Sequence, residues 1–98
     1  MIYHVTQQTN WLKAKADGAY KAPSLSIEGF IHASSKQQVA GVLHRYYQNE
    51  TGLILLHIDE TKLTSPLKYE LSPSVNQQFP HIYGPINLEA VVDIQPIP

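Results

Sequence analysis

The pattern of apolar and polar positions is clearest between residues 39 and 46. Apolar residues recur there at helical spacing, in the order Val39, Val42, Leu43 and Tyr46. This spacing predicts a helix that turns one face toward the core. A capping box is expected at its start, formed either by Ser34 with Gln37 or by Ser35 with Gln38. The helix is expected to end within residues 49–52.

Strand character is strongest in two segments. Residues 2–6 are β-branched or aromatic at most positions, which is typical of a strand. Residues 53–59 are apolar at nearly every position, and this predicts a central strand covered on both faces. Shorter strands are expected at 30–34 and 68–71, and a closing strand at 86–94. Along the strand at 30–34, the alternation of side chains puts Phe30, His32 and Ser34 on one face.

The segments between these elements contain one more helix and two irregular stretches. Trp11 and Ala14 have helical spacing, and Asp17-Gly18 is a typical helix end. Residues 19–26 are expected to be irregular around Pro23, and residues 72–80 to form a polar loop. The order of elements predicts a single α+β domain over residues 1–98, with a mixed or mainly antiparallel sheet and two main helices.

Composition and charge exclude several classes of protein. The chain has 98 residues, of which 43% are hydrophobic, and contains no cysteine, so disulfides and Cys-ligated zinc are excluded. No apolar run approaches the ~20 residues of a membrane-spanning helix, and a cytoplasmic location is the expectation. The formal net charge is −1 and the cations are scattered, so no DNA partner is expected. Nothing in the sequence favours a particular oligomeric state.

Histidine is the residue type that most suggests chemistry. The chain has five histidines, and His4, His32 and His81 each lie beside aromatic or β-branched residues at the edge of a predicted strand. Brought together, three such imidazoles would form a substrate pocket able to donate, accept or carry protons near neutral pH. The alternative is that each is a hydrogen-bonded structural side chain. His44 is expected to be solvated, and His57 to be a packing residue.

Carboxylates and hydroxyls add further candidates. Glu70 in a short strand is ordinary if it faces outward, but facing inward it needs a partner, and a histidine is the natural one. Glu28 either caps a turn or joins the site, and Tyr20 and Ser24 are candidates for the mouth of a pocket. The histidines are 28, 12, 13 and 24 residues apart. This spacing lacks the short ligand pairs of metal motifs, so no metal is expected.

Several strings of residues occur together in a known order. They are Ile2-Tyr3-His4, Trp11, Gly18-x-Tyr20, Ser24-Leu25, residues 28–34 (EGFIHAS), residues 53–59, Glu70, and residues 79–85 (FPHIYGP). Over about residues 2–94 the chain resembles the small bacterial family called domain of unknown function 952. The resemblance implies a compact split sheet similar to that of the ADP-ribosyltransferases, which hold NAD in a cleft.

The same resemblance implies roles for particular residues. His4 corresponds to the first-strand histidine that binds ribose and the nicotinamide amide in the transferases. Residues 29–34 resemble the strand that packs an aromatic residue against nicotinamide, but Phe30, Ile31 and His32 stand where a tyrosine is expected. Glu70 is only a candidate for the transferase glutamate that holds the reacting ribose. NAD is the candidate substrate, and no cofactor is otherwise implied.

Three function classes follow from these observations. The first is an enzyme of ADP-ribosyl transfer or NAD cleavage, with His4, His32, Glu70 and His81 as catalytic candidates. The second is a binder of an NAD-like nucleotide without chemistry, and the third is an interaction module without a ligand site. The ligand-binding candidates are Tyr20, Ser24, Glu28, Phe30, Ser34 and Tyr83. Two X-Pro steps stiffen residues 79–85, so His81 and Tyr83 are expected on the wall of the same cleft as His4.

Overall fold

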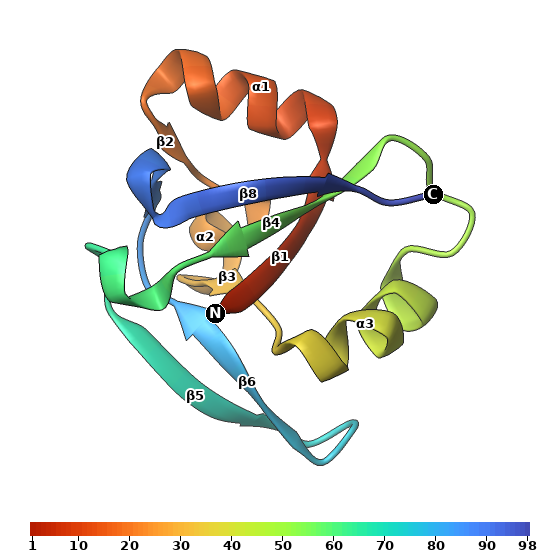
Figure 1. Cartoon of the computed structure of the whole chain (residues 1–98). Helices are drawn as coiled ribbons and strands as arrows, with labels where there is room; N and C mark the ends of the chain where they lie inside the picture. Colours follow the sequence, from red (N-terminus) through yellow and green to blue (C-terminus); the bar gives the residue numbers. More distant parts are fainter.

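The computed structural model describes residues 1–98 and consists of eight strands, three α-helices and three 3-10 turns (Figure 1). The strands are β1 (Ile2–Gln7), β2 (Ala19–Tyr20), β3 (Ile31–His32), β4 (Leu53–Ile58), β5 (Leu67–Ser72), β6 (Gln77–Ile82), β7 (Ile86–Asn87) and β8 (Val91–Pro96). The α-helices are α1 (Gln8–Asp17), α2 (Pro23–Glu28) and α3 (Val39–Tyr46), and the 3-10 turns are Lys36–Gln38, Glu60–Lys62 and Leu88–Ala90. No helix is long and apolar enough to cross a membrane.

The strands form three small sheets in which every pairing is antiparallel. One sheet has the order β1-β4-β8, the second β3-β6-β5, and the third consists of β2 and β7. The strand predicted at 53–59 is β4, and it is indeed central in its sheet. The predicted α+β class is therefore confirmed, and of the two sheet types left open the antiparallel one is present.

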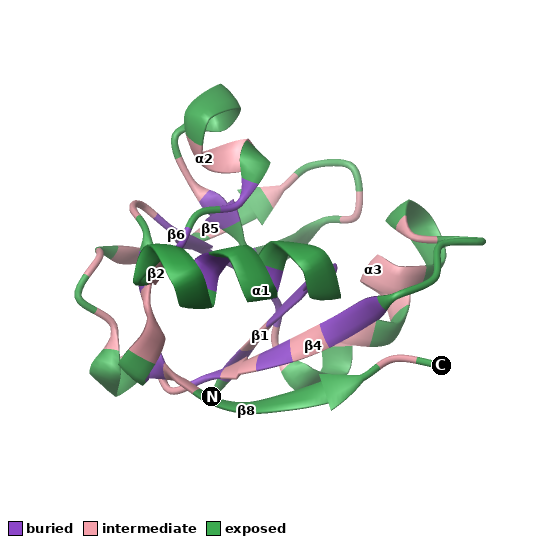
Figure 2. Ribbon diagram, turned by 90° about the horizontal axis from the view of Figure 1, so that it is seen from above, coloured by how far each residue is buried: buried purple, intermediate pink, exposed green.

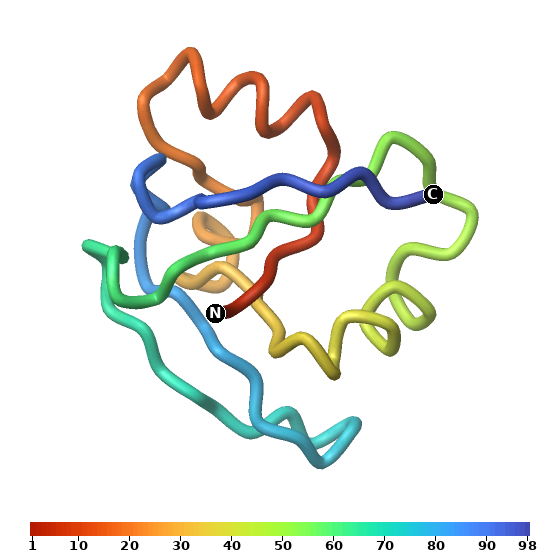
Figure 3. The backbone as a smooth tube through the Cα atoms, in the orientation of Figure 1, coloured from red at the N-terminus to blue at the C-terminus, as the bar shows by residue number.

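A short segment joins the two larger sheets. Ile31 and His32 pair with Ile82 and His81 of β6, whereas Ser34 forms a bridge with Tyr3 of β1. The two backbone hydrogen bonds of that bridge are 2.8 and 2.7 Å long. Figure 3 shows the chain passing at this point from the β5–β6 hairpin toward β1. The segment therefore fixes the position of one sheet relative to the other.

Pro80 explains where β3 stops. The Ala33 N–H donates to the Pro80 carbonyl over 3.0 Å. In an antiparallel ladder the return bond would come from the amide of residue 80, but proline has no N–H. The ladder between β3 and β6 therefore ends here, and the next residue of the chain pairs with β1 instead.

The first predicted helix, α1, is confirmed. It buries Trp11 and Ala14, the two residues at helical spacing. It ends at Gly18, whose φ of 89° is left-handed and whose N–H donates to the Ala14 carbonyl. Glycine adopts this conformation without the steric penalty of a side chain, so the Asp-Gly pair marks the helix end correctly.

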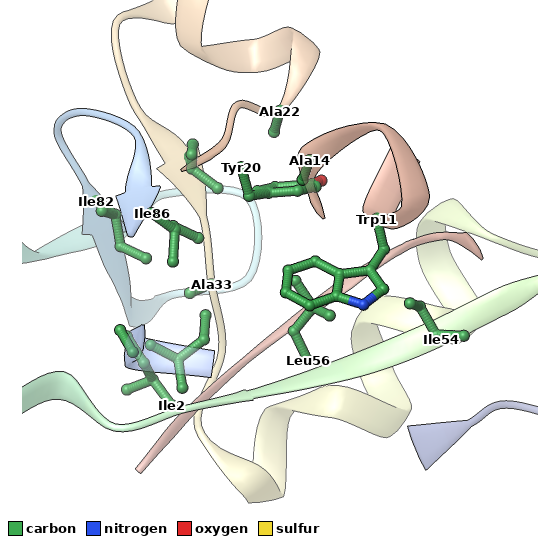
Figure 4. Packing of buried hydrophobic residues seen from close by; sticks show 13 residues of the cluster. Ile2, Trp11, Ala14, Tyr20, Ala22, Ala33, Ile54, Leu56, Ile82 and Ile86 are labelled. Carbon is green, nitrogen blue, oxygen red and sulfur yellow. The ribbon is translucent and has the colours of Figure 1, made fainter. Parts of the chain in front are cut away.

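The core lies between α1, β4 and the β6–β7 region. It is a cluster of thirteen buried residues: Ile2, Trp11, Ala14, Tyr20, Ala22, Ile31, Ala33, Ile54, Leu56, Ile58, Ile82, Ile86 and Ala90. Figure 4 shows the indole of Trp11 packed near Leu56, and Figure 2 shows that the buried residues follow the strands and the inner face of α1. None of the thirteen comes from α3.

The predicted role of α3 is therefore wrong in one respect. The helix is present, and the Gln38 side-chain oxygen accepts from the Ser35 N–H at 3.0 Å, which selects the second of the two capping registers. Its apolar stripe, however, has no buried residue, and Tyr46 is 62% exposed. Two of the four residues of the stripe, Val42 and Tyr46, line a cleft instead.

Residues 19–26 are not irregular, contrary to the prediction. They contain β2 and most of α2, and Pro23 starts this helix rather than bending a loop. Proline is favoured in the first turn of a helix because its fixed φ suits the helix and its missing N–H needs no partner there. The domain thus has three α-helices instead of two.

Two further predictions are wrong at the C-terminal side. The polar loop expected at 72–80 is only a turn at 73–76, because β6 begins at Gln77 and pairs with β5. The closing strand expected at 86–94 is divided into β7, a 3-10 turn and β8. The division is needed because β7 pairs with β2 in one sheet, whereas β8 pairs with β4 in another.

Removal of a core side chain should destabilise the domain strongly. Leu56 is fully buried in β4, so Leu56→Ala is expected to lower the free energy of unfolding by about 3 kcal/mol. Leu12→Ala is the matched control, because Leu12 on α1 is 53% exposed and its loss should change stability by less than about 0.5 kcal/mol. Urea denaturation of both variants measures the difference. Equal effects would contradict the assignment of the core.

Candidate functional site

A cleft of about 690 Å³ lies between β1, β3 and β6 on one side and α3 on the other. Seven of the ten candidate residues line it: His4, Tyr20, Ser24, Glu28, His32, Ser34 and His81. The other three, Phe30, Glu70 and Tyr83, do not line it but contact His81 or its partners. The fold therefore brings the candidate residues together in two layers, one at the cleft and one behind it.

His4 is the buried end of a hydrogen-bond chain. Its Nδ1 lies 2.5 Å from the His32 carbonyl oxygen, and its Nε2 lies 2.8 Å from the Tyr20 hydroxyl. The Tyr20 hydroxyl is also 2.8 Å from Thr6 Oγ1. Because a carbonyl only accepts, Nδ1 carries the proton and donates to it.

The direction of the remaining bonds follows from that proton. A neutral His4 accepts at Nε2, so the hydrogen of the Tyr20 hydroxyl lies between two acceptors, His4 Nε2 and Thr6 Oγ1. The Asn10 amide donates to Thr6 Oγ1 at 3.3 Å. Thr6 Oγ1 therefore accepts from both the Asn10 amide and the Tyr20 hydroxyl, and no buried polar side-chain atom in the protein lacks a partner.

Burial keeps His4 neutral. Desolvation lowers the pKa of His4 to about 4, although the bond to the His32 carbonyl works in the opposite direction. Desolvation also raises the pKa of Tyr20 to about 12. Near neutral pH the pair is therefore an uncharged acceptor and donor system, suited to orienting a polar group rather than carrying charge.

His81 is held by a carboxylate. Its Nδ1 lies 2.8 Å from Glu70 Oε1, and the Tyr83 hydroxyl donates to the same oxygen. These bonds lower the pKa of the Glu70 carboxyl, first through Tyr83 and then through His81, and the bond to Glu70 raises the pKa of Tyr83. Glu70 is thus an ionised acceptor, and His81 donates to it through Nδ1.

The second nitrogen of His81 is left open. His81 lines the cleft, and its Nε2 has no partner in the protein. Since no fully buried polar side-chain atom is unpartnered, Nε2 must reach solvent. When Nδ1 holds the proton of a neutral imidazole, Nε2 is an acceptor, and His81 can take a proton from a molecule in the cleft.

An aromatic cluster supports these histidines. The Phe30 ring stacks on His81 at 4.1 Å between centroids and 22° between planes, and His32 lies edge-on to His81 at 5.4 Å. His32 Nε2 is 3.0 Å from a Glu28 carboxylate oxygen in a pair exposed to solvent. Phe30 therefore fixes the plane of the His81 ring, while His32 sits at the open side of the cleft.

Two serine candidates have structural partners. The Ser24 hydroxyl donates to the Phe30 carbonyl at 2.9 Å, and the Ser34 backbone pairs with Tyr3. Both residues line the cleft. Ser24 therefore holds the turn before β3, while the Ser34 hydroxyl forms no hydrogen bond with another residue of the protein.

The apolar part of the cleft lining was not predicted from the sequence. It comprises Val42 and Tyr46 of α3, Tyr47 directly after that helix, Leu71 of β5 and Phe79 of β6. The apolar stripe of α3 was the available signal, but sequence periodicity cannot distinguish a stripe that faces a core from one that faces a cleft. No three histidine, aspartate or glutamate side chains are grouped so as to hold a metal ion.

The chain belongs to the family described as "Protein of unknown function (DUF952)", whose model matches residues 5–94. The crystal structure of protein CC0527 from Caulobacter crescentus is similar, with a TM-score of 0.86 and 29% sequence identity over 95% of this chain and 82% of that chain. The solution NMR structure of CC0527 has a TM-score of 0.80 at 29% identity, over 95% and 80%. No match was found among the curated proteins. The likeness to ADP-ribosyltransferases stays a prediction.

The buried neutral state of His4 should make the fold sensitive to acid. As the pH falls from about 6.5 to about 4, the unfolded state takes up a proton on this residue before the folded state does. The stability that depends on neutral His4 is complete above pH 6.5 and lost toward pH 4. This pKa difference corresponds to roughly 3 kcal/mol.

Denaturation curves at several pH values measure this loss. His4→Gln should reduce the fall in unfolding free energy between pH 6.5 and 4, whatever its effect on absolute stability. His44→Gln is the control, because His44 is exposed and bonds only to Gln48, and it should keep the wild-type slope. An NMR titration in which His4 protonates near pH 6.5 would contradict the prediction directly.

Proposed function

We propose that the protein is an enzyme of the ADP-ribosyltransferase type that binds an NAD-like nucleotide in the cleft and breaks the bond between its ribose and nicotinamide. The observation that carries the proposal is the Glu70–His81 pair, whose histidine lines the cleft and has an Nε2 without a partner in the protein. A carboxylate that orients one imidazole nitrogen leaves the other ready to accept a proton. The volume of about 690 Å³ is in the usual range for a ligand pocket.

In this proposal His81 acts as the general base. Cleavage requires water or an acceptor hydroxyl to bond to C1′ of the ribose, while nicotinamide leaves with the electron pair of the broken bond. The attacking oxygen loses its proton to His81 Nε2, and the proton then passes to solvent. Glu70 does not line the cleft, so it is a positioning residue that holds His81 rather than a group that holds the ribose itself.

His4 and Tyr20 orient the substrate. Both line the cleft, and their hydrogen-bond chain is rigid, uncharged and complete within the protein. Both ring nitrogens of His4 are already bonded within the protein, so a ribose hydroxyl or a carboxamide N–H would donate to a free lone pair of the Tyr20 oxygen. His32, beside His81 at the open side, can bind or exchange protons with the acceptor.

The apolar wall suits the flat part of the ligand. Tyr46 at the end of α3 and Tyr47 directly after it line the cleft, together with Phe79 of β6. Aromatic side chains stack on heteroaromatic rings such as nicotinamide or adenine. Burial of an exposed residue such as Tyr46 by a bound ring would also remove apolar surface from water.

A second candidate is a nucleotide binder without turnover. It is favoured by the position of Glu70, because that carboxylate already accepts from both His81 and Tyr83 and does not line the cleft. The carboxylate that does line the cleft is Glu28, and it is paired with His32. The two candidates share the ligand site and differ only in release of nicotinamide.

Calorimetry with NAD and a chromatographic assay of nicotinamide test both candidates. The wild type should bind NAD and release nicotinamide, whereas His81→Asn should retain binding and lose release by about a hundredfold or more. His57→Gln is a matched control, because His57 lies outside the cleft and bonds to Gln95. Binding without release by the wild type favours the second candidate, and absence of binding rejects both.

The positioning role of Glu70 has its own readout. ¹⁵N NMR of the wild type should show His81 with the proton on Nδ1, because the ionised carboxylate accepts only from that nitrogen. Glu70→Gln should lose this tautomer preference, bring the pKa of Tyr83 down toward its ordinary value, and slow nicotinamide release at unchanged NAD affinity. An unchanged tautomer in this variant would remove Glu70 from the mechanism.

A further inference from the structure

A second groove of about 420 Å³ lies between α1, β2 and α2, next to the cleft. Asn10, Ala22 and Pro23 belong to the walls of both hollows. The two are therefore neighbours, separated only by these side chains. Figure 2 shows that most of the ribbon of α1 and α2 consists of exposed or intermediate residues.

The two hollows differ in charge. No lysine or arginine lines the cleft, whereas Lys13 and Lys21 both line the groove. Asp17 is the only carboxylate in the groove lining, and it lies 3.5 Å from the Lys13 ammonium in an exposed pair on α1. Lys21 is in no ion pair or side-chain hydrogen bond of the structure. The three charges sum to +1, with one ammonium free to meet an anion.

An extended nucleotide requires both an uncharged cleft and a cationic groove beside it. Its aromatic ring and ribose need stacking surfaces and uncharged hydrogen-bonding groups, which the cleft supplies. Its phosphates are anionic and need cations, because desolvation of a phosphate without a counter-charge is costly. A polar side chain at the boundary, Asn10, is able to bond to either part.

We propose that the groove is the phosphate-binding part of the same site, with Lys21 and Lys13 as the groups that contact the phosphates. This inference rests on the proposed nucleotide ligand and adds where its charged part binds. It also defines the ligand class: a nucleotide with at least one phosphate attached to the ribose, rather than a free nucleoside or base.

The test compares NAD with nicotinamide riboside, which lacks phosphate. In calorimetry the double variant Lys13→Gln/Lys21→Gln should weaken NAD binding by about tenfold and reduce its dependence on NaCl concentration. Its affinity for nicotinamide riboside should equal that of the wild type. Lys15→Gln is the matched control, since Lys15 lies on α1 but lines neither hollow, and it should bind NAD as the wild type does.

Each outcome has a distinct meaning. Wild-type NAD affinity in the double variant, or an equal loss in Lys15→Gln, overturns the phosphate site while leaving the proposed function intact. Failure of the wild type to bind either ligand rejects the proposed function, and the phosphate site with it. Because Lys13 and Lys21 are exposed, a thermal unfolding midpoint near that of the wild type is expected for the double variant and confirms that it is folded.

Discussion

The four residues from Ile31 to Ser34 hydrogen-bond to β6 at one end and to β1 at the other, and the architecture of the cleft depends on this exchange of partners. Pro80 enforces it, because its missing N–H stops the ladder with β6 after one bond from Ala33. As a result His32 lies opposite His81, and its carbonyl comes within reach of His4. Three histidines distant in sequence are thereby placed around one space by backbone pairing alone.

Within that space, identical side chains acquire different chemistry from their surroundings. His4 is buried against a carbonyl and a phenol, so desolvation keeps it neutral. His81 is held by an ionised carboxylate and keeps one nitrogen open to the cleft. The first environment suits orientation of a polar group and the second suits proton transfer. The difference between the surroundings of these two imidazoles is the main physical support for the proposal that the cleft is catalytic.

The small size of the domain also shapes the site. The thirteen-residue core is built from α1, the strands and short connecting segments, without any residue of α3. Two residues of the apolar stripe of that helix, Val42 and Tyr46, are therefore available to line the cleft, together with Tyr47 directly after the helix. A cleft with one apolar and one polar wall can bind a molecule that has both kinds of surface. The exposed Tyr46 ring is part of that apolar surface.

The sequence by itself determined the α+β class, the central strand β4, the helices α1 and α3, and the set of residues around His4, His32 and His81, because each depends on local periodicity or on residue type. It misassigned residues 19–26, where Pro23 begins a helix instead of a bend, and residues 72–80 and 86–94, where the pairing of β6 with β5 and the change of sheet between β7 and β8 decide the structure. Only the tertiary structure decided that Glu70 stands behind His81 and that two residues of the α3 stripe line a cleft. The physical reason is that strand pairing and side-chain burial are set by long-range contacts, which the spacing of residues along a single chain does not encode.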